Sequence, residues 1–223
     1  MLKRCLLSAL TLGAVALAEP AFASFHFMQI EQVIGGVNGD VTKQAIQLRM
    51  RTGGQNVVSL SRIRAWDAAG LNPVLLVNLT ADVTNGASGS RVLISTDAFN
   101  TTFPAAPRNA AMTPIPASYL AAGRITFEGD DGTIYWSLAW GGAGYTGSNA
   151  GSTTNDADGN FGPPVNGALP STGTTALFFT GAATALSTNN LANYATTASA
   201  ASFTNNNGQT AVVPVELQQF KVE

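Results

Sequence analysis

The most regular alternation of apolar and polar positions in this chain lies between residues 124 and 144. The stretch reads RITFEGDDGTIYWSLAWGGAG. Two β-type runs flank the turn-forming quartet Gly129–Gly132, so the stretch is predicted to form a β-hairpin. In the second arm large apolar side chains recur at every second position, at Ile134, Trp136, Leu138 and Trp140. This period of two predicts one buried face, and we expect this arm to supply the centre of the core.

Shorter runs with similar patterning recur on both sides of the hairpin and are separated by turn-forming residues. Strands are predicted, in chain order, over residues 27–34, 45–51, 60–66, 74–79, 91–95, 176–180, 201–204 and 210–215, with 217–222 as a last edge. Many short strands with turn signals between them predict an all-β fold in which two sheets pack as a sandwich.

Helical structure is expected to be short. Thr96-Asp97 is predicted to cap one helical turn over 98–103, and a second turn is expected over 117–122. Regular structure between these turns is excluded by Pro104, Pro107, Pro114 and Pro116. Residues 141–173, rich in Gly, Ser, Thr, Asn and Pro, are too many for an ordinary connection. We therefore expect that segment to be either functional or mobile.

The N-terminus has the pattern of a secretory signal peptide over residues 1–23. Lys3 and Arg4 precede an apolar run over 5–18, and Ala21-Phe22-Ala23 fits the cleavage rule. The run is too short for a membrane span, so no integral membrane segment is expected after cleavage. The sequence thus predicts a secreted protein, extracellular or periplasmic, with a single β-sandwich domain over 24–223.

Composition narrows the class of partner. Charged residues make up 11% of the chain, against about 25% in average soluble domains. The mature chain keeps nine basic and twelve acidic residues, so nothing indicates binding of nucleic acid. The chain's single cysteine lies in the signal peptide, which leaves the mature chain without a disulfide, a thiolate nucleophile or a thiolate metal site.

Three short stretches carry a resemblance to a known family. Residues 28–35, MQIEQVIG, form an apolar-alternating strand with an acid and a closing glycine, and 45–50 follow as a second strand. Later, Ala139-Trp140-Gly141 is followed by Tyr145-Thr146-Gly147. Together these resemble the opening strands and the late W-G-x-Y-T-G stretch of the secreted bacterial branch of the lamin-tail-like β-sandwich family. The resemblance implies an immunoglobulin-like two-sheet sandwich with an extracellular accessory or adhesive role, and it brings no catalytic residues.

Basic side chains cluster on two predicted strands. Two arginines share one face of 45–51, and two more share one face of 60–66 with a tryptophan; the set is Arg49, Arg51, Arg62, Arg64 and Trp66. If these strands are neighbours, the side chains form one outward patch suited to a sulfated, phosphorylated or carboxylated glycan. The interpretation that we favour is a solvated face whose arginines pair with Glu31 or Asp residues across strands.

A glycine-rich loop offers a candidate Ca²⁺ site. Its alternating oxygen side chains are Asp156, Asp158 and Asn160. These residue types are the ones found at positions 1, 3 and 5 of a calcium loop. Phe161 and Gly167 stand where that loop has its glycine and its bidentate glutamate. The competing interpretation is a series of Asx-turns, in which these side chains accept hydrogen bonds from their own backbone.

His26 is the one histidine of the chain, and no nucleophile motif surrounds a serine. Cleavage after Ala23 would leave Ser24-Phe25-His26 at a free amine, an arrangement that can hold Cu(II) or Ni(II) in a square plane. A polar residue at the start of the first strand is the simpler interpretation.

These observations favour a non-enzymatic secreted or surface-associated β-sandwich module with an adhesion, matrix or accessory binding role. The first alternative is a glycan-binding or polysaccharide-modifying extracellular protein, and the second is a calcium-dependent structural domain. An extracellular glycan or surface polymer is the partner class that fits best. The sequence leaves the oligomeric state open.

Overall fold

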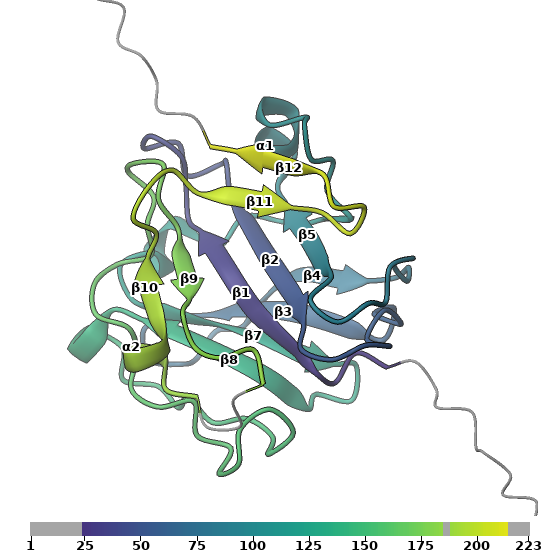
Figure 1. Cartoon of the computed structure of the whole chain (residues 1–223). Helices are drawn as coiled ribbons and strands as arrows, with labels where there is room; N and C mark the ends of the chain where they lie inside the picture. The colour runs from purple at the N-terminus through teal and green to yellow at the C-terminus, as the bar shows by residue number, and fades with distance from the viewer. Residues whose placement is uncertain (1–23, 185–187, 214–223) are drawn as a thin grey trace, which may run out of the picture.

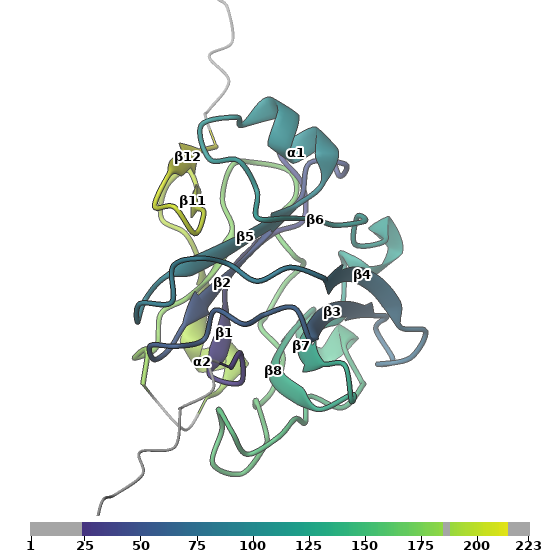
Figure 2. The same ribbon diagram turned by 90° about the vertical axis from the view of Figure 1, so that its right-hand side faces the viewer.

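Two β-sheets form the two layers of the molecule (Figures 1 and 2). The computed structural model describes residues 24–184 and 188–213. The first sheet contains, in spatial order, β10 (Tyr194–Thr196), β9 (Leu177–Phe179), β1 (Met28–Ile34), β2 (Ala45–Met50), β5 (Arg91–Ser95) and β6 (Ala110–Ala111). The second contains β4 (Val74–Leu79), β3 (Ser61–Trp66), β7 (Gly123–Gly129) and β8 (Ile134–Trp140). The predicted all-β sandwich character is confirmed, and a separate two-stranded sheet accompanies the two main sheets.

The core lies between the two sheets and is centred on β8. Trp136, Leu138 and Trp140 are fully buried, as the alternation in this arm predicts. They pack in one cluster with apolar side chains of β1, β2, β3 and β7. The Trp136 indole also donates a 2.8 Å hydrogen bond to the Tyr194 hydroxyl, which in turn donates to the Ile30 carbonyl. This chain of hydrogen bonds ties β8 to β10 and β1 through the core, and burial raises the pKa of the Tyr194 phenol.

The prediction that Ile134 shares the core face was wrong, because β8 contains a bulge. Phe127 pairs with Trp136, but the next residue of β7, Glu128, pairs with Ile134, so Tyr135 is an extra residue in the ladder. A one-residue register shift exchanges the two faces of a strand. Ile134 is therefore paired with an outward-facing residue, while Tyr135 joins the core cluster.

Most of the predicted elements are present. The helical turn is α1 (Asp97–Thr102), and the Thr96 hydroxyl caps it by accepting from the Phe99 amide. The turn expected over 117–122 is a 3-10 helix, η1 (Ala117–Tyr119). Four short elements lie where none was predicted: β6, η2 (Gly142–Gly144), β10 and α2 (Asn190–Asn193). Of these, β6 corrects the prediction that the prolines exclude all regular structure between the two helical turns. Residues 1–23 and 217–222, predicted to be a signal peptide and an edge strand, lie outside the described residues.

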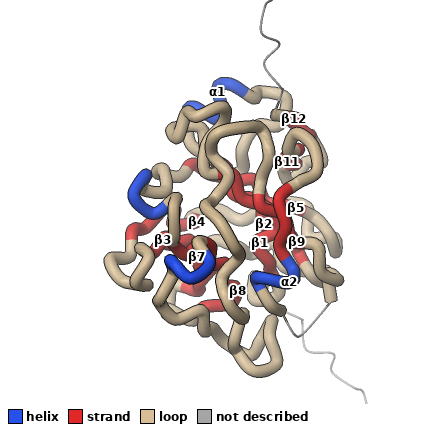
Figure 3. The backbone as a smooth tube through the Cα atoms, turned by 90° about the vertical axis from the view of Figure 1, so that its left-hand side faces the viewer, coloured by secondary structure: helices blue, strands red, loops and turns tan. Residues whose placement is uncertain are grey.

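The segment 141–173 is anchored along the free edge of β8. Its regular structure is one 3-10 turn, η2 (Gly142–Gly144), and Val165 and Ser152 donate backbone hydrogen bonds to β8. Farther along the chain, the Asn190 side chain accepts from the Ala139 amide at 2.9 Å and donates to the Ser137 carbonyl at 3.1 Å. Loops and α2 therefore cover this edge, as Figure 3 shows, and an exposed strand edge is avoided.

The outer face of the six-stranded sheet is partly covered. The hairpin of β11 (Ser202–Thr204) and β12 (Thr210–Val212) crosses it, and α1 lies next to the hairpin at the upper end of the sheet (Figure 1). A second apolar cluster fills the space beneath, with Leu93, Phe99 and Phe203 fully or almost fully buried. Within the part of the chain that the structure describes, no helix is long and apolar enough to cross a membrane.

Replacing Trp136 tests the centre of the core. Trp136→Ala should lower the free energy of unfolding by about 3–5 kcal/mol, because a fully buried ring leaves a cavity. Urea unfolding followed by circular dichroism measures the change. Leu71→Ala, at a side chain that is largely exposed, should stay within about 0.5 kcal/mol of the parent. Equal stability of the two variants would contradict the assigned core.

Candidate functional site

The four arginines predicted as one patch lie on different sides of the sandwich. Strands β2 and β3 are not neighbours, because β2 belongs to the six-stranded sheet and β3 to the four-stranded sheet. Arg49 projects outward from β2, opposite the buried Leu48 and Met50. Arg62 and Arg64 project outward from β3. The single patch is thus replaced by two faces that point away from each other.

On the six-stranded sheet, a buried glutamate holds two arginines. The Glu31 side chain is 1% exposed. Arg91 binds it in bidentate fashion, with Nε–Oε2 and Nη2–Oε1 distances of 2.7 and 3.1 Å, and Arg49 approaches to 3.7 Å. The Gln47 amide adds a 2.7 Å hydrogen bond. The sequence-based pairing of Arg49 with Glu31 is confirmed.

Arg51 does not belong to either face. It lies just beyond β2, is largely buried, and donates to the Ala183 carbonyl and to both oxygens of Asn155. Its guanidinium lies 5.3 Å from the centre of the Trp136 ring. Burial lowers its pKa, while the nearby Asp156 opposes that effect. Arg51 therefore anchors the 155–160 loop to the core.

On the four-stranded sheet, Glu128 is a buried glutamate that pairs with two arginines, as Glu31 does on the six-stranded sheet. It is 1% exposed and lies 3.0 Å from Arg62 and 3.5 Å from Arg64. The Thr126 hydroxyl donates to its second oxygen and accepts a 3.0 Å hydrogen bond from the Trp66 indole. One connected network thus fixes two arginines and a tryptophan on the surface of β3.

Trp66 also contacts an arginine of the neighbouring strand, β7. The guanidinium of Arg124 lies 5.8 Å from the centre of the indole ring. Arg124 is itself buried, where it donates to the Ser137 hydroxyl and the Ala150 carbonyl, and burial lowers its pKa. Leu75, paired across the strands with Arg64, is half exposed. This face therefore combines guanidinium groups with exposed apolar surface.

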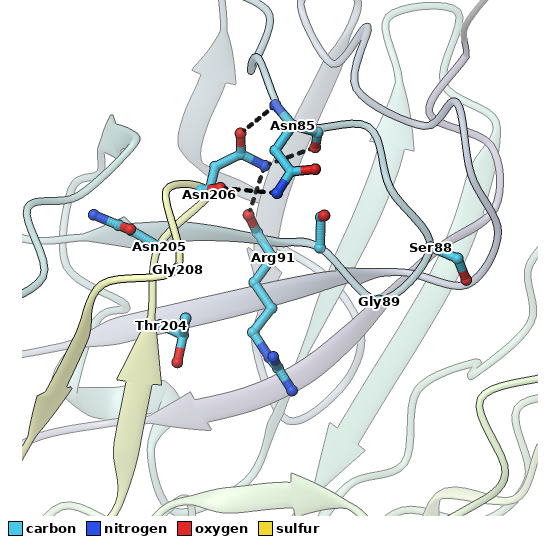
Figure 4. A pocket seen from close by; sticks show the side chains of 9 residues that line it. Asn85, Ser88, Gly89, Arg91, Thr204, Asn205, Asn206 and Gly208 are labelled. Carbon is cyan, nitrogen blue, oxygen red and sulfur yellow. Dashed lines mark hydrogen bonds between the residues drawn. The ribbon is translucent and has the colours of Figure 1, made fainter.

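A small pocket lies beside Arg91 (Figure 4). Its volume is about 260 Å³, and it separates the turn of the β11–β12 hairpin from the loop that precedes β5. The asparagines around it are already bonded: Asn206 donates to the carbonyls of Asn85 and Arg91, both at 3.0 Å, and accepts from the Asn85 amide. These hydrogen bonds fasten the hairpin to the sheet, and Ser88, Ser90 and Arg91 also line the pocket.

The 155–160 loop has the Asx-turn geometry. Asp156 accepts from the amide of Asp158, Asp158 from the amide of Asn160, and Asn160 from the amide of Gly162, at 2.8–3.2 Å. The second oxygen of Asp156 accepts from the Thr188 amide and hydroxyl at 2.6 and 2.7 Å. No group of three or more His, Cys, Asp or Glu side chains among the described residues is arranged to hold a metal ion.

Calcium binding stays a prediction. If the loop binds Ca²⁺, the melting temperature should rise in 5–10 mM Ca²⁺, a range that covers weak extracellular modules, and should fall in chelator. Asp158→Asn, at an exposed carboxylate, should remove the response. Identical melting curves with Ca²⁺ and with chelator would leave the Asx-turns as the full account of the loop.

The first three residues that the structure describes, Ser24, Phe25 and His26, contact the β2–β3 turn and the β7–β8 hairpin. The Ser24 amide donates to the Gly54 carbonyl at 2.8 Å, Phe25 is buried, and the His26 ring stacks on Tyr135. Copper binding by Ser24, Phe25 and His26 requires cleavage after Ala23, and it would take the Ser24 nitrogen away from Gly54. The copper hypothesis also stays a prediction.

Comparison of the chain with protein-family models, with curated proteins and with solved structures gives no match. The functional argument therefore rests on the residues themselves.

Two participants in these faces were missed from the sequence. Arg91 opens its strand and has no basic neighbour at a spacing of two, so the pattern that marked the other arginines gave no signal. Glu128 was not identified as a partner for the arginines, although it belongs to β7 and pairs with Arg62. Glu128 lies two and four residues after Thr126 and Arg124, so the period of two already placed it on the same face of the strand as these residues.

Asp156 is expected to stabilise the fold without any metal. Burial raises the pKa of its carboxyl, but the hydrogen bonds from Thr188 and Asp158 outweigh burial, and the net direction is downward. The ionised group therefore stabilises the fold above its unfolded pKa of about 4, and the contribution is lost as the pH falls through the lower folded value.

Asp156→Asn tests this role. The amide would present a donor to the Thr188 donors, so we expect a loss of about 1–3 kcal/mol at pH 7 in chelator, and a weaker acid dependence of stability below about pH 4. Urea titrations at several pH values measure both. Asp158→Asn keeps an acceptor for its turn and should cost less than about 0.5 kcal/mol. Equal losses would show that Asp156 has no special role.

Proposed function

We propose that this chain is a secreted, non-catalytic β-sandwich module that binds an acidic polysaccharide through the outer face of β3 and β7. One observation carries the proposal: Arg64 and Trp66 stand at alternate positions of one strand, while the carboxylate that holds Arg64 is itself buried. Arg64 is 31% exposed and Glu128 is 1% exposed, so an approaching anion meets the guanidinium and not the carboxylate.

The chemistry of this face fits a polymer of charged sugars. A guanidinium offers paired donors that match a sulfate or carboxylate, and an indole offers a flat apolar surface to the ring of a sugar. The network through Thr126 and Glu128 fixes both groups before binding, which lowers the entropy cost of association. Leu75 extends the apolar surface next to Arg64.

The strand order supports an immunoglobulin-like type of sandwich. In that type, strands A, B and E share one sheet and strands C, F and G share the other. Here β1, β2 and β5 are neighbours in one sheet, and β3, β7 and β8 are neighbours in the other. Taken in chain order, these six strands follow the same distribution, with β4 added beside β3 and with β9 and β10 added beside β1. Such sandwiches serve widely as extracellular binding modules.

Two further features support the proposal. The predicted signal peptide over 1–23 supports export. The W-G and Y-T-G stretch, which carries the resemblance to the lamin-tail-like family, has a structural role. Gly141 has a φ of 104°, and a Cβ there would lie 2.4 Å from that of Ala122; the Tyr145 hydroxyl donates to the Ser148 carbonyl.

The two faces supply a matched pair of variants for testing the proposal. Arg64 is 31% exposed and 3.5 Å from Glu128, and Arg49 is 32% exposed and 3.7 Å from Glu31. Each can be replaced while another arginine stays on the same glutamate. We expect the protein to bind a heparin resin at low salt, and Arg64→Gln to weaken that binding about tenfold, the effect of one lost charge-assisted interaction. Trp66→Ala should also weaken it.

Arg49→Gln should leave retention unchanged. If Arg49→Gln and not Arg64→Gln weakens retention, the polyanion binds the opposite sheet, beside the pocket of Figure 4. Passage of the unmodified protein through the column at low salt would overturn the proposal.

A further inference from the structure

A second pocket lies under the turn between β7 and β8, away from Arg64 and Trp66. Its volume is about 230 Å³. It is lined by Phe25, His26, Leu60, Gly129, Asp130, Asp131 and Tyr135. Three aromatic rings and a leucine therefore share one small concavity with two carboxylates.

The aromatic wall of this pocket is fixed before any ligand arrives. The His26 and Tyr135 rings are stacked, with centroids 4.5 Å apart and planes 17° apart. Phe25 meets both edge-on, at 4.9 and 5.6 Å, and packs on the core residue Phe127. Phe25 and Tyr135 are buried, whereas His26 is exposed at the rim. The bulge in β8 places Tyr135 in this wall.

Leu60 forms an apolar part of the lining that faces water. Its side chain is 58% exposed. Its carbonyl accepts a 2.9 Å hydrogen bond from the Asp130 amide, which fixes the leucine relative to the turn. Apolar surface displayed inside a pocket favours a ligand with apolar groups of its own.

The charged groups of this pocket are two exposed carboxylates and the His26 ring. Asp130 and Asp131 are exposed, and no ion pair to either is found among the described residues. Arg62 donates to the Asp130 backbone carbonyl, but its ion pair is with Glu128. Hydrogen bonds from the backbone and hydroxyl of Thr133 lower the pKa of Asp131, and His26 adds to the effect, so this carboxyl is ionised at neutral pH.

We propose that this pocket binds a small organic cation, an alkylammonium group of the kind carried by choline. Aromatic rings and carboxylates attract such a cation, and its methyl groups fit apolar walls. A hard metal ion needs several oxygen ligands, which the rings and Leu60 do not supply. An anion would be repelled, and a neutral apolar ligand would leave the two charges unmatched.

Choline and its uncharged carbon analogue, 3,3-dimethyl-1-butanol, separate charge from shape. In amide NMR titrations at constant ionic strength, choline should shift the signals of His26, Leu60 and Asp131 saturably. The analogue should bind at least about tenfold more weakly. Equal responses to the two compounds, no saturable response to choline, or shifts confined to other residues would overturn the proposal.

Variants locate the charge. Asp131 and Asp158 are both exposed and both accept from the amide two residues on, at 2.9 and 2.8 Å. Asparagine can accept at either site, so both variants should fold, which melting curves check. Asp131→Asn should weaken choline binding about fivefold, and Asp130→Asn/Asp131→Asn more, while Asp158→Asn leaves it unchanged. Unaltered affinity in the double variant would overturn the proposal.

A neutral variant tests the apolar wall. Leu60→Ser, at an exposed position, should fold and weaken choline binding about threefold; unchanged affinity would overturn the role of this wall. Arg64→Gln should bind choline normally, so failure at this pocket is distinguishable from failure of the polysaccharide proposal.

Sedimentation with phosphatidylcholine vesicles that free choline reverses would assign the cation to a lipid headgroup. Choline binding without sedimentation would assign it to a soluble or polymer-borne group.

Discussion

The structure depends on two glutamates that are almost completely removed from water. Burying a carboxylate costs several kcal/mol unless paired charges and hydrogen bonds compensate it. Glu31 and Glu128 satisfy this condition on opposite sheets, each with two arginines and a neighbouring donor. The positions of four of the chain's arginines follow from that constraint. In a chain with so few charges, it also decides which surfaces are positive.

The two faces are alike in charge but not in access. The hairpin of β11 and β12 crosses the outer side of the six-stranded sheet, and Thr204 and Ser202 are bonded to Gln47 and Gln32 beneath it. Within the described residues no hairpin covers the outer side of β3 in this way, and Arg64 and Leu75 remain partly exposed. The ionic cluster on the six-stranded sheet therefore lies beside a docked hairpin, which is bonded to its Gln47, whereas the cluster on the four-stranded sheet is open to solvent.

Strand positions could be predicted from the sequence, because an alternating or continuous apolar run of five to seven residues is a local property. Val74–Leu79 and Arg91–Ser95 have the predicted bounds, and the Thr96 cap is also local. Sheet membership is not local. The predicted single arginine patch was wrong because β2 and β3 belong to different sheets. The spacing of residues in the sequence does not encode which strands become neighbours. The bulge at Tyr135 likewise follows from the register with β7, and it moved Ile134 off the core face.

The two partners of β1 constrain the order in which the strands can pair during folding. β1 is bonded to β2 on one side and to β9 on the other, and the Gln32 side chain reaches Ser202, 170 residues along the chain. Contacts at such separations make folding slow, because a long loop must close before they form. During synthesis, one edge of β1 therefore has no partner until β9 has been made. An apolar strand in that position would associate with other chains. The polar residues Gln29, Glu31 and Gln32 are buried in the finished fold, and we expect them to limit such association while this edge of β1 is open.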